Sequence, residues 1–586
     1  MLYKDLAEYY AKLESTTKRL EMTDILTDML KSADAEEIRQ IIYLTQGKLH
    51  PDWKNEPELG LAERTAIQAI AQAVGIETDK VQKALNKIGD IGIVAEELVK
   101  NKSQMTIFEQ EPLKVIDVYS KLDKIAKTTG EGSNKRKIKI LAGLISDASP
   151  LEARYILRTV TGEMRLGIAD MTILDALALA FTGDKANREF LERAYNLTSD
   201  LGEVAELIAT KGLNAIKNIK IIVGRPIRMM AAQRLPNAKE ILEKMGGKCF
   251  AEYKYDGERI QAHKDGETVV LYSRRQEQIS EQYPDVCEYI RKYVKAKQAI
   301  IEGECVAIDL STGKMKPFQE LMQRKRKYDI SEKVKELPVK LFTFDVLYVD
   351  GMDYTLKAFT ERRNKLSKII DESSEITLTT GKEIHTPEEL LDFFDDAIAE
   401  GCEGIMAKSM SENAIYQAGA RSWLWVKLKK SYQEGLTDSV DLVIVGAFYG
   451  RGKRAGVYGT ILAAAYDPDT DTFQTVCKLG SGFTEDDLEV LKQRLEPITL
   501  EHKHPRVVSE IDADIWFQPK YVIEVLGDEI TLSPIHTCCK GKISQDAGLA
   551  IRFPRFISWR DDKSPEEATT PEELINMYKQ FLESKG

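Results

Sequence analysis

The 586-residue sequence is poor in the residues that form disulfides or bind transition metals. It holds seven cysteines, scattered and without a CxxC pair, and six histidines, none in a metal-binding spacing such as HExxH. These absences argue against a four-cysteine zinc site and indicate a reducing compartment. No apolar run approaches the ~20 residues that span a bilayer, and the first residues carry no basic-then-apolar leader. We therefore expect a cytoplasmic protein with no membrane partner.

Two signatures of nucleotide binding are also missing. The chain has neither a GxxxxGK[ST] loop nor a GxGxxG stretch that opens a helix, so a Walker-type or Rossmann-type site is not supported. If a nucleotide binds here, side chains must hold it. The net charge of −11 argues against a protein that coats nucleic acid indiscriminately, although dense basic stretches lie at 323–329, 427–430 and 451–454.

A chain of this length is expected to contain three or four domains, because domains average ~100–200 residues. Residues 1–215 show apolar residues at three- and four-residue spacing, which predicts helices throughout. Short alternating strands with interleaved helices follow, and later short strands with glycine-rich turns indicate a small barrel. We expect a multi-domain α+β protein, with an all-helical N-terminal domain at 1–215, a mixed α/β domain with antiparallel sheets at 216–430, and a β-barrel at 431–586.

The clearest single helix is predicted from Pro387 to about Glu400. Thr386 is a typical N-cap, and Pro387 occupies the first turn. Glu389 is expected to complete a capping box, and Gly401 to end the helix.

The stretch EYKYDGER places Lys254 two residues from Glu252 and two residues from Asp256. In an extended strand these three side chains point to one face, and Tyr253 and Tyr255 point to the other. The pattern predicts a lysine directed into a polar site. A solvated strand edge that carries charges of both signs is the alternative.

Other stretches also place carboxylates and cations on strands. Glu302 and Glu304 share a strand face in AIIEGECVAID, and Lys408 lies five residues after Glu403 in EGIMAK. Lysine and arginine neutralise phosphate oxygens, and carboxylates without histidine or cysteine suit a hard ion such as magnesium. These stretches therefore predict phosphate and metal chemistry. Further candidate cations close two other strands: Arg274, Arg275, Lys427 and Lys429.

Lys254 can act as a nucleophile only in its neutral form. The ordinary pKa of a lysine is ~10.4, so very little of it is neutral at pH 7. Nearby cations, a bound metal and partial burial lower that pKa, and a shift of about three units raises the neutral fraction roughly a thousandfold. We therefore expect a lowered pKa at Lys254, opposed by Asp256. An amine so tuned attacks phosphorus and forms a covalent intermediate.

Seven stretches resemble, in order, the motifs of an ATP-dependent DNA ligase of the archaeal and eukaryotic type. The family's hallmark, KxDGxR, stands at Lys254, Asp256, Gly257 and Arg259. The N-terminal stretch EARYILRTVTGEMRLGIAD is similar to the DNA-binding domain of these ligases, so the likeness covers nearly the whole chain. It implies a nucleotidyltransferase domain in the middle and an OB fold for the barrel. The six further motifs are YSRR, EGE, FDVLYVDG, EGIMAK, WVKLK, and RFPRFISWRDDK with Arg560, Asp562 and Lys563.

The resemblance implies an enzyme that seals nicks in duplex DNA during replication, repair and recombination. Lys254, with Asp256 beside it, would attack the α-phosphate of ATP, release pyrophosphate and hold AMP. The AMP would pass to the 5′-phosphate of the nick, and the 3′-hydroxyl would then displace it. Glu304 and Glu403 would bind Mg²⁺ or Mn²⁺. The other residues implied to hold ATP are Glu252 and Phe344 at the adenine, Arg259 and Arg274 at sugar and phosphate groups, Lys427 and Lys429 at the α-phosphate, and Arg560 and Lys563 at the leaving pyrophosphate. Glu304, Lys408 and Arg421 are also implied to contact ATP.

Nicked double-stranded DNA is the partner that the resemblance implies, bound by a monomer that is nucleoid-associated in a prokaryote. If one helix carries Arg154 and Arg158, they lie one turn apart on the same face, and Arg165 is placed to join them. Such arginines can bind backbone phosphates, which position DNA without reading its sequence. A solvated arginine stripe is the alternative.

The stretch QMTIF resembles a shortened peptide of the kind that binds the sliding clamp (PCNA). Gln104, Ile107 and Phe108 would be its anchors. An exposed Ile-Phe pair in a loop predicts an interaction site. A buried loop anchor is the alternative.

Other functions compete with DNA ligation. The runner-up is an RNA-directed member of the same superfamily, an RNA ligase or an mRNA capping enzyme, which by family resemblance lacks the long helical N-terminal domain. An NAD-dependent ligase is disfavoured, because that family carries a zinc-binding cysteine set that this sequence lacks. A catalytically inactive DNA-bridging protein is the alternative from another class. Labelled ATP separates it from a ligase, because only the ligase acquires a covalent label on Lys254.

Overall fold

The computed structural model describes residues 1–586 except residues 17, 58, 60, 102–110, 163, 236, 310, 317, 325–333, 430–438, 451–457, 501 and 586. The described residues form two compact units. The first unit comprises residues 1–78 and 95–429, and the second comprises residues 79–94 and 430–586. No helix in the described part of the chain is both long enough and apolar enough to cross a membrane.

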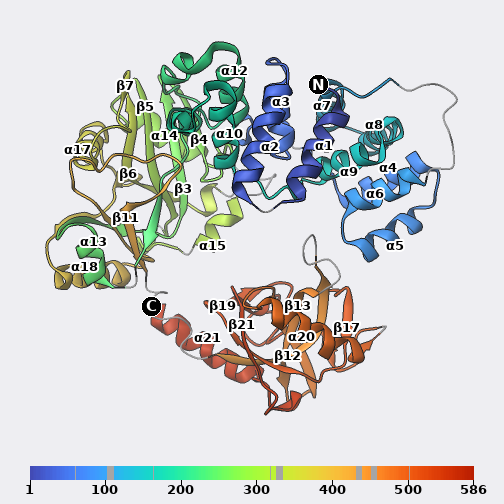
Figure 1. The fold of residues 1–586 in the computed structure, drawn as a ribbon. Coiled ribbons are helices and arrows are strands. Elements are labelled where there is room, and N and C mark those ends of the chain that lie inside the picture. The colour runs from blue at the N-terminus through green and yellow to red at the C-terminus, as the bar shows by residue number, and fades with distance from the viewer. Residues whose placement is uncertain are drawn as a thin grey trace. The chain divides into compact units, whose positions relative to one another are not determined.

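Helices make up the N-terminal part of the chain, drawn in blue to green in Figure 1. Local sequence sets their ends: before the helix Pro150–Thr161, Ser149 and Glu152 form a capping box, and Gly162 (φ 73°) follows the helix in the left-handed conformation. The described residues before Ala231 form no strand, which confirms the predicted helical N-terminal region. The helices are α1 (Tyr3–Glu14), α2 (Arg19–Ser32), α3 (Ile38–Thr45), η1 (Asp52–Lys54), α4 (Glu63–Val74), α5 (Thr78–Ile88), α6 (Ile91–Lys100), α7 (Val115–Lys127), α8 (Ser133–Asp147), α9 (Pro150–Thr161), α10 (Asp170–Thr182), η2 (Lys185–Asn187), α11 (Arg188–Thr198) and α12 (Leu201–Lys217).

One sheet of the first unit has the strand order β1–β11–β10–β2–β9, with β1 parallel to β11 and the other neighbours antiparallel. Val426 and Leu428 alternate on β11 and share an apolar core with helices α13 and α18. The odd-numbered side chains of β11 therefore lie on the other face of the sheet. The elements are β1 (Ala231–Arg234), α13 (Ala238–Lys244), β2 (Cys249–Lys254), β9 (Gly381–Ile384), α18 (Pro387–Ala399), β10 (Gly404–Lys408) and β11 (Arg421–Lys429).

A second sheet of the first unit has the order β4–β3–β5–β6–β7, all antiparallel, and β8 joins β6 in parallel. Apolar side chains of α14, such as Val286 and Ile290, and of α17, such as Leu366, pack on this sheet in one core. The elements are β3 (Glu258–Asp265), β4 (Thr268–Tyr272), α14 (Pro284–Tyr293), β5 (Gln298–Ala307), α15 (Phe318–Leu321), η3 (Met322–Arg324), β6 (Val339–Val349), β7 (Met352–Asp353), α17 (Phe359–Ile369) and β8 (Ile376–Leu378).

The two sheets of the first unit meet through aromatic side chains. Tyr255 stacks on Phe342 with ring centroids 3.8 Å apart. Phe344 of β6 meets Trp425 of β11 edge to face at 6.2 Å. The Nζ atom of Lys408, on β10, donates to the Phe344 carbonyl at 3.1 Å. These contacts place Tyr255, just after β2, and side chains of β10 and β11 opposite those of β6, close to most of the predicted site residues.

The second unit contains a curled sheet with the order β15–β17–β12–β13–β14–β16, and β18 pairs with both β12 and β21. Register shifts between β12 and β13 and between β13 and β14 bend the strands, as β-bulges do. The sheet forms a half-barrel, which agrees with the predicted OB fold. The elements are β12 (Val440–Tyr449), β13 (Tyr458–Asp467), β14 (Thr472–Leu479), α20 (Glu485–Leu495), η5 (Glu496–Ile498), β15 (Thr499–Leu500), β16 (Val507–Val508), β17 (Ile515–Phe517), β18 (Val522–Leu526), β19 (Glu529–Ser533), β20 (Gly548–Arg552), β21 (Arg555–Trp559), η6 (Pro565–Glu567) and α21 (Pro571–Lys585).

Candidate active site

Lys254 is the last residue of β2, opposite Gly404 on β10. The glycines of the surrounding motifs are required by close backbone approach. A Cβ atom on Gly404 would lie 2.1 Å from the carbonyl oxygen of Leu428, and one on Gly257 would lie 2.2 Å from that of Cys305. Both clashes are with backbone, which cannot move aside as a side chain can. The glycines of KxDGxR and EGIMAK therefore allow the strands around Lys254 to come together.

The amine of Lys254 forms an ion pair with Glu403, and Lys429 of β11 reaches the same carboxylate oxygen at 2.5 Å. The backbone holds this pair in place, because the Glu403 N–H donates to the Lys254 carbonyl at 2.9 Å. All three side chains are only about a quarter exposed. The structure thus brings together three residues that the sequence places in three separate motifs.

The carboxylates around Lys254 raise its pKa, whereas the sequence predicted a lowered one. Burial lowers the pKa of Lys254, but Glu403 and Glu304 outweigh burial, and the net shift is upward. Burial likewise opposes ionisation of Glu403, yet Lys254 and Lys429 lower its pKa to about 2. The prediction was wrong for the residues of the protein alone, because the motif places an acid, not a cation, in direct contact with the amine. A substrate or ion that engages Glu403 would remove this effect.

Two further carboxyl groups, Glu304 and Asp256, interact electrostatically with Lys254. Burial raises the pKa of Glu304 to about 7, although Lys254 and Arg259 oppose the shift. Burial and Glu403 raise the pKa of Asp256, whose Oδ2 atom accepts a hydrogen bond from the Phe318 N–H at 3.4 Å. Four acidic and basic groups therefore titrate under each other's influence at one end of β2, as is common at functional sites.

The donors at Glu304 and Glu403 fit a hard divalent cation. Both groups are carboxylates, and Mg²⁺ commonly takes one or two carboxylates and completes its shell with waters and substrate phosphates. Among the described residues, no group of three or more His, Cys, Asp or Glu side chains is placed to hold a metal by itself. An ion at this position would therefore need ligands from a substrate or from water.

Glu252 lies on the same face of β2 as Lys254 and is almost fully buried. Its carboxylate pairs with Lys408 at 2.7 Å and with Arg363 at 3.0 Å. Lys408 is 1% exposed, and burial lowers its pKa although Glu252 opposes the shift. The Nζ atom of Lys408 also lies 4.9 Å from the ring centroid of Phe344, which Trp425 contacts at its edge. The predicted adenine contacts, Glu252 and Phe344, are thus both neighbours of one lysine.

Arg259 and Glu302 form a second buried pair beside this group. Arg259 donates to Glu302 at 2.8 Å and to the Met230 carbonyl at 2.8 Å. The Tyr416 hydroxyl donates to Glu302 at 2.9 Å and accepts from the Met230 N–H at 2.9 Å. Gln261 donates to the other oxygen of Glu302 at 3.1 Å. Every oxygen of this carboxylate is therefore occupied, which fixes the orientation of Arg259.

Arg363 and Tyr416 are residues of the site that sequence reasoning missed. Arg363 lies on α17, where a basic residue is normally a solvated one, and Tyr416 lies in a loop without a motif. Their importance comes from Glu252 and Glu302, the carboxylates they contact. No local pattern in the sequence could have identified either residue.

The remaining predicted cations of the first unit are more open to solvent. Lys427 lies between β10 and β1 on β11, and burial together with Lys429 and Lys254 lowers its pKa to about 8. Arg274 and Arg259 line a hollow of about 530 Å³. Arg421, at the start of β11, lines another hollow of about 350 Å³.

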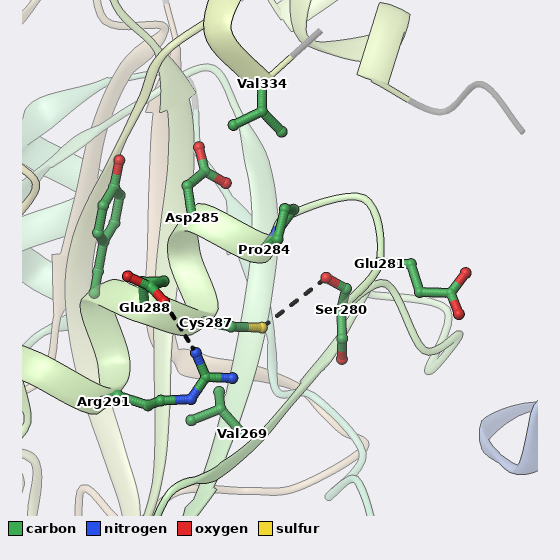
Figure 2. A pocket seen from close by; sticks show the side chains of 10 residues that line it. Val269, Ser280, Glu281, Pro284, Asp285, Cys287, Glu288, Arg291 and Val334 are labelled. Carbon is green, nitrogen blue, oxygen red and sulfur yellow. Dashed lines mark hydrogen bonds and ion pairs between the residues drawn. The ribbon is translucent and has the colours of Figure 1, made fainter. Parts of the chain in front are cut away.

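Another hollow, of about 550 Å³, lies beside α14 (Figure 2). Cys287 points from this helix towards the Ser280 carbonyl, and Arg291 pairs with Glu288 on the same helix at 3.7 Å. None of the lining residues belongs to a predicted motif. Because its arginine is paired locally, this hollow does not present the converging cations that phosphate groups require.

The N-terminal arginines Arg154 and Arg158 pair with carboxylates of the protein in the structure. Arg154 and Arg158 do lie one turn apart on α9, but both pair with Glu14, and Arg154 also pairs with Glu96. Arg158 is 2% exposed and donates to both oxygens of Glu14 at 2.9 Å. This burial argues against its predicted phosphate contact. Arg165 is half-buried, with a positive φ of 58°.

The predicted clamp anchors Gln104, Ile107 and Phe108 lie outside the described residues.

In the second unit, Arg560 and Lys563 both pair with Asp441, at 2.9 Å and 2.6 Å. The structure thus brings these two motif residues together on one acid that the sequence analysis did not single out.

Comparisons with known proteins identify the family of the chain. Family models match residues 2–178 (DNA ligase N terminus), 229–429 (ATP dependent DNA ligase domain) and 454–563 (ATP dependent DNA ligase C terminal region). The DNA ligase 2 of Thermofilum pendens is 54% identical over 585 residues, which cover 98% of this chain and 97% of that protein. The DNA ligase of Sulfolobus acidocaldarius is 52% identical over 591 residues, which cover 100% of this chain and 99% of that protein.

A solved structure named Pmar-Lig_Pre shares the fold alone. Its TM-score is 0.56 at 16% identity, and the match covers 95% of this chain and 99% of that one. The full-length relatives carry the stronger conclusion, because more than half of the residues are identical over nearly the whole of both chains. This chain belongs to the ATP-dependent DNA ligases of the archaeal type.

Proposed function

We propose that Lys254 is the residue that carries AMP in this ligase. The observation that supports it most is the amine's position: it lies between Glu403, Glu304 and Lys429 at the end of β2, beside the buried group of Glu252, Lys408 and Phe344. A nucleophile therefore stands next to a buried group of side chains that combines an aromatic ring with polar groups. Such a combination can bind an adenine and present its α-phosphate to the amine.

The first step forms a bond between Nζ of Lys254 and the α-phosphorus of ATP. The bond from that phosphorus to the bridging oxygen breaks, and its electron pair leaves with pyrophosphate. The amine must lose its proton before it attacks, so release of Lys254 from Glu403 is part of the step. Lys427 and Lys429 would neutralise the α-phosphate, and Asp256 would orient the amine.

The remaining nucleotide contacts follow the same geometry. Glu252 and Phe344 would hold the adenine, with Lys408 fixed between them. Arg259 and Arg274, on the hollow of about 530 Å³, would bind sugar and phosphate groups, and Arg421 would bind a further part of ATP. Glu304 and Glu403 would hold a Mg²⁺ or Mn²⁺ ion, which when bound neutralises phosphate charge.

The second and third steps complete nick sealing. AMP passes from Lys254 to the 5′-phosphate of a nick, and the 3′-hydroxyl then attacks that phosphorus and releases AMP. Arg560 and Lys563 would act in the first step only, by orienting pyrophosphate when the second unit comes over the site.

We propose three domains, at 1–215, 216–430 and 431–586, which the family matches support.

The N-terminal helical region would bind the duplex, with Arg154 and Arg165 as the better candidates for phosphate contacts. We also propose that Gln104, Ile107 and Phe108 bind the sliding clamp and that the enzyme works as a monomer. Clamp binding unchanged by Phe108→Ala would end that part of the proposal.

All seven cysteines are buried free thiols, which supports a reducing, cytoplasmic location.

Incubation with labelled ATP and a nicked duplex tests the proposed function. We expect ATP and not GTP to label the protein, the label to move to the nick, and sealed strands to accumulate. Transfer of label to nicked RNA but not to nicked DNA would favour the RNA-directed alternative.

A further inference from the structure

Arg560 and Lys563, the cations proposed to engage pyrophosphate, are both held by one carboxylate. The Nη1 atom of Arg560 lies 2.9 Å and 3.0 Å from the two oxygens of Asp441, and the amine of Lys563 lies 2.6 Å from one of them. The Lys563 N–H donates to the Arg560 carbonyl at 3.1 Å, so a tight turn sets both side chains on the same side. Asp441 is therefore the point at which the two cations converge.

Asp441 is itself fixed by the fold. It lies on β12 opposite Glu524 of β18, and its side chain is 13% exposed. Its N–H donates to the Thr569 hydroxyl at 2.9 Å, and its carbonyl accepts from the Thr569 N–H at 2.8 Å. Strand pairing on one edge and Thr569 on the other leave the carboxylate little freedom.

The other acid in contact with Arg560, Asp562, is much more exposed to solvent than Asp441. Asp562 binds the Nε and Nη2 atoms at 2.9 Å and 2.7 Å, but its side chain is 63% exposed. An exposed pair of this kind contributes little to order, because solvent screens it. A phosphate group can displace Asp562 from the outer edge of the guanidinium while Asp441 keeps its hold on Nη1.

We propose that Asp441 is a positioning residue of the adenylylation step. It holds Arg560 and Lys563 side by side as one preformed site for the leaving pyrophosphate, and it offsets the repulsion between them. This inference rests on the proposed function of Arg560 and Lys563. Positioning dominates phosphoryl-transfer catalysis, so two cations that are free to separate would serve the leaving group poorly.

Asp441→Asn tests the proposal, because it removes the charge and keeps the shape. With the full chain, ATP and Mg²⁺, we expect the maximal rate of Lys254 adenylylation to fall by about 10- to 100-fold. Sealing of a nick that already carries AMP on its 5′-phosphate should stay close to wild type, since pyrophosphate takes no part in it. Asp441→Glu should restore part of the adenylylation rate. The matched control is Asp471→Asn, which removes an ion pair with Arg506 in the same unit and should change neither rate.

Two outcomes would overturn the proposal: an adenylylation rate of Asp441→Asn equal to or above wild type, or an equal loss in both reactions, which would indicate a structural role only. Arg560→Ala separates this result from a failure of the proposed function. If Arg560→Ala leaves adenylylation unchanged, the proposed role of the closing motif fails, and Asp441 has nothing to position. If Arg560→Ala slows adenylylation, Asp441→Asn decides the question alone.

Discussion

Lys254 and Glu403 are held together twice, through an ion pair between their side chains and through a backbone hydrogen bond of 2.9 Å. The acid thus keeps the amine in place and also keeps it protonated, because it raises the pKa of Lys254. In this arrangement the lysine is positioned but not yet reactive. The adenylylation step must weaken the hold of Glu403, and binding of a divalent ion by that carboxylate would do so.

Glu403→Gln should shift the reactivity of Lys254 to lower pH. The variant removes the largest of the influences that raise the pKa, so burial is then opposed by the weaker effects of Glu304 and Asp256, and the neutral amine appears at a lower pH. The measurement is the pH dependence of Lys254 modification by an amine reagent, without ATP and with a chelator present. Glu383→Gln, which removes a surface partner of Lys248, is the control and should leave the profile unchanged. A profile that stays in place, or moves to higher pH, would contradict this account.

Glu252→Gln should destabilise β2 and β10 locally. Lys408 is 1% exposed and would lose its charged partner, and breaking one half of a buried pair costs about 3–5 kcal/mol. Glu252→Leu combined with Lys408→Met should be less destabilising, because the buried charge of Lys408 is then removed as well and Arg363, which also donates to the Thr379 carbonyl, is the cation left without this carboxylate. Hydrogen exchange of the β2 and β10 amides measures both effects. Equal protection of these amides in Glu252→Gln and in wild type would show that the local stability of β2 and β10 does not depend on the ion pair between Glu252 and Lys408.

Phe344→Ala should weaken ATP binding by about 1–3 kcal/mol, the usual contribution of a base stacked on an aromatic ring. Phe344 is half-buried and lies between Lys408 and Trp425, so its ring is already oriented. The ATP concentration that gives half the maximal adenylylation rate measures the effect. Phe344→Trp keeps a stacking surface and serves as the control. Unchanged half-saturation in the alanine variant would remove Phe344 from the adenine site.

Arg158→Met should lower stability without altering the salt dependence of DNA binding. Its guanidinium is buried against Glu14, so the variant leaves that carboxylate without its main partner. A residue that contacts a phosphate contributes about one unit to the slope of log affinity against log salt concentration. We expect the slope of Arg158→Met to equal that of wild type. A slope reduced by about one would instead support the DNA contact first predicted for Arg158.

Much of the fold followed from local sequence signals. Helix α18 begins and ends close to its predicted bounds, because Thr386 caps its N-terminus and Gly401, with φ 85°, follows its end. The predicted capping box formed only in part: Glu389 accepts a hydrogen bond from the His385 N–H instead of that of Thr386. Such details depend on the path of the preceding chain, which local patterns do not fix.

The sequence predicted the residues and properties of the site less completely than it predicted the helices and strands. Strand alternation correctly placed Glu252 and Lys254 on one face, since period-two geometry needs only the sequence. The pKa direction at Lys254 was wrong, because it depends on Glu403, which the chain brings back from about 150 residues away. Asp441 and Tyr416 were missed for the same reason: each acquires its role from a partner distant in the sequence.

The most direct test of the central claim is covalent labelling of the purified full chain with ATP that carries its label on the α-phosphate. We predict a denaturant-stable label on the peptide that contains Lys254, absent from Lys254→Ala, and released when nicked duplex DNA is added. A protein that acquires no covalent label, or a Lys254→Ala variant that acquires the same label, would contradict the account.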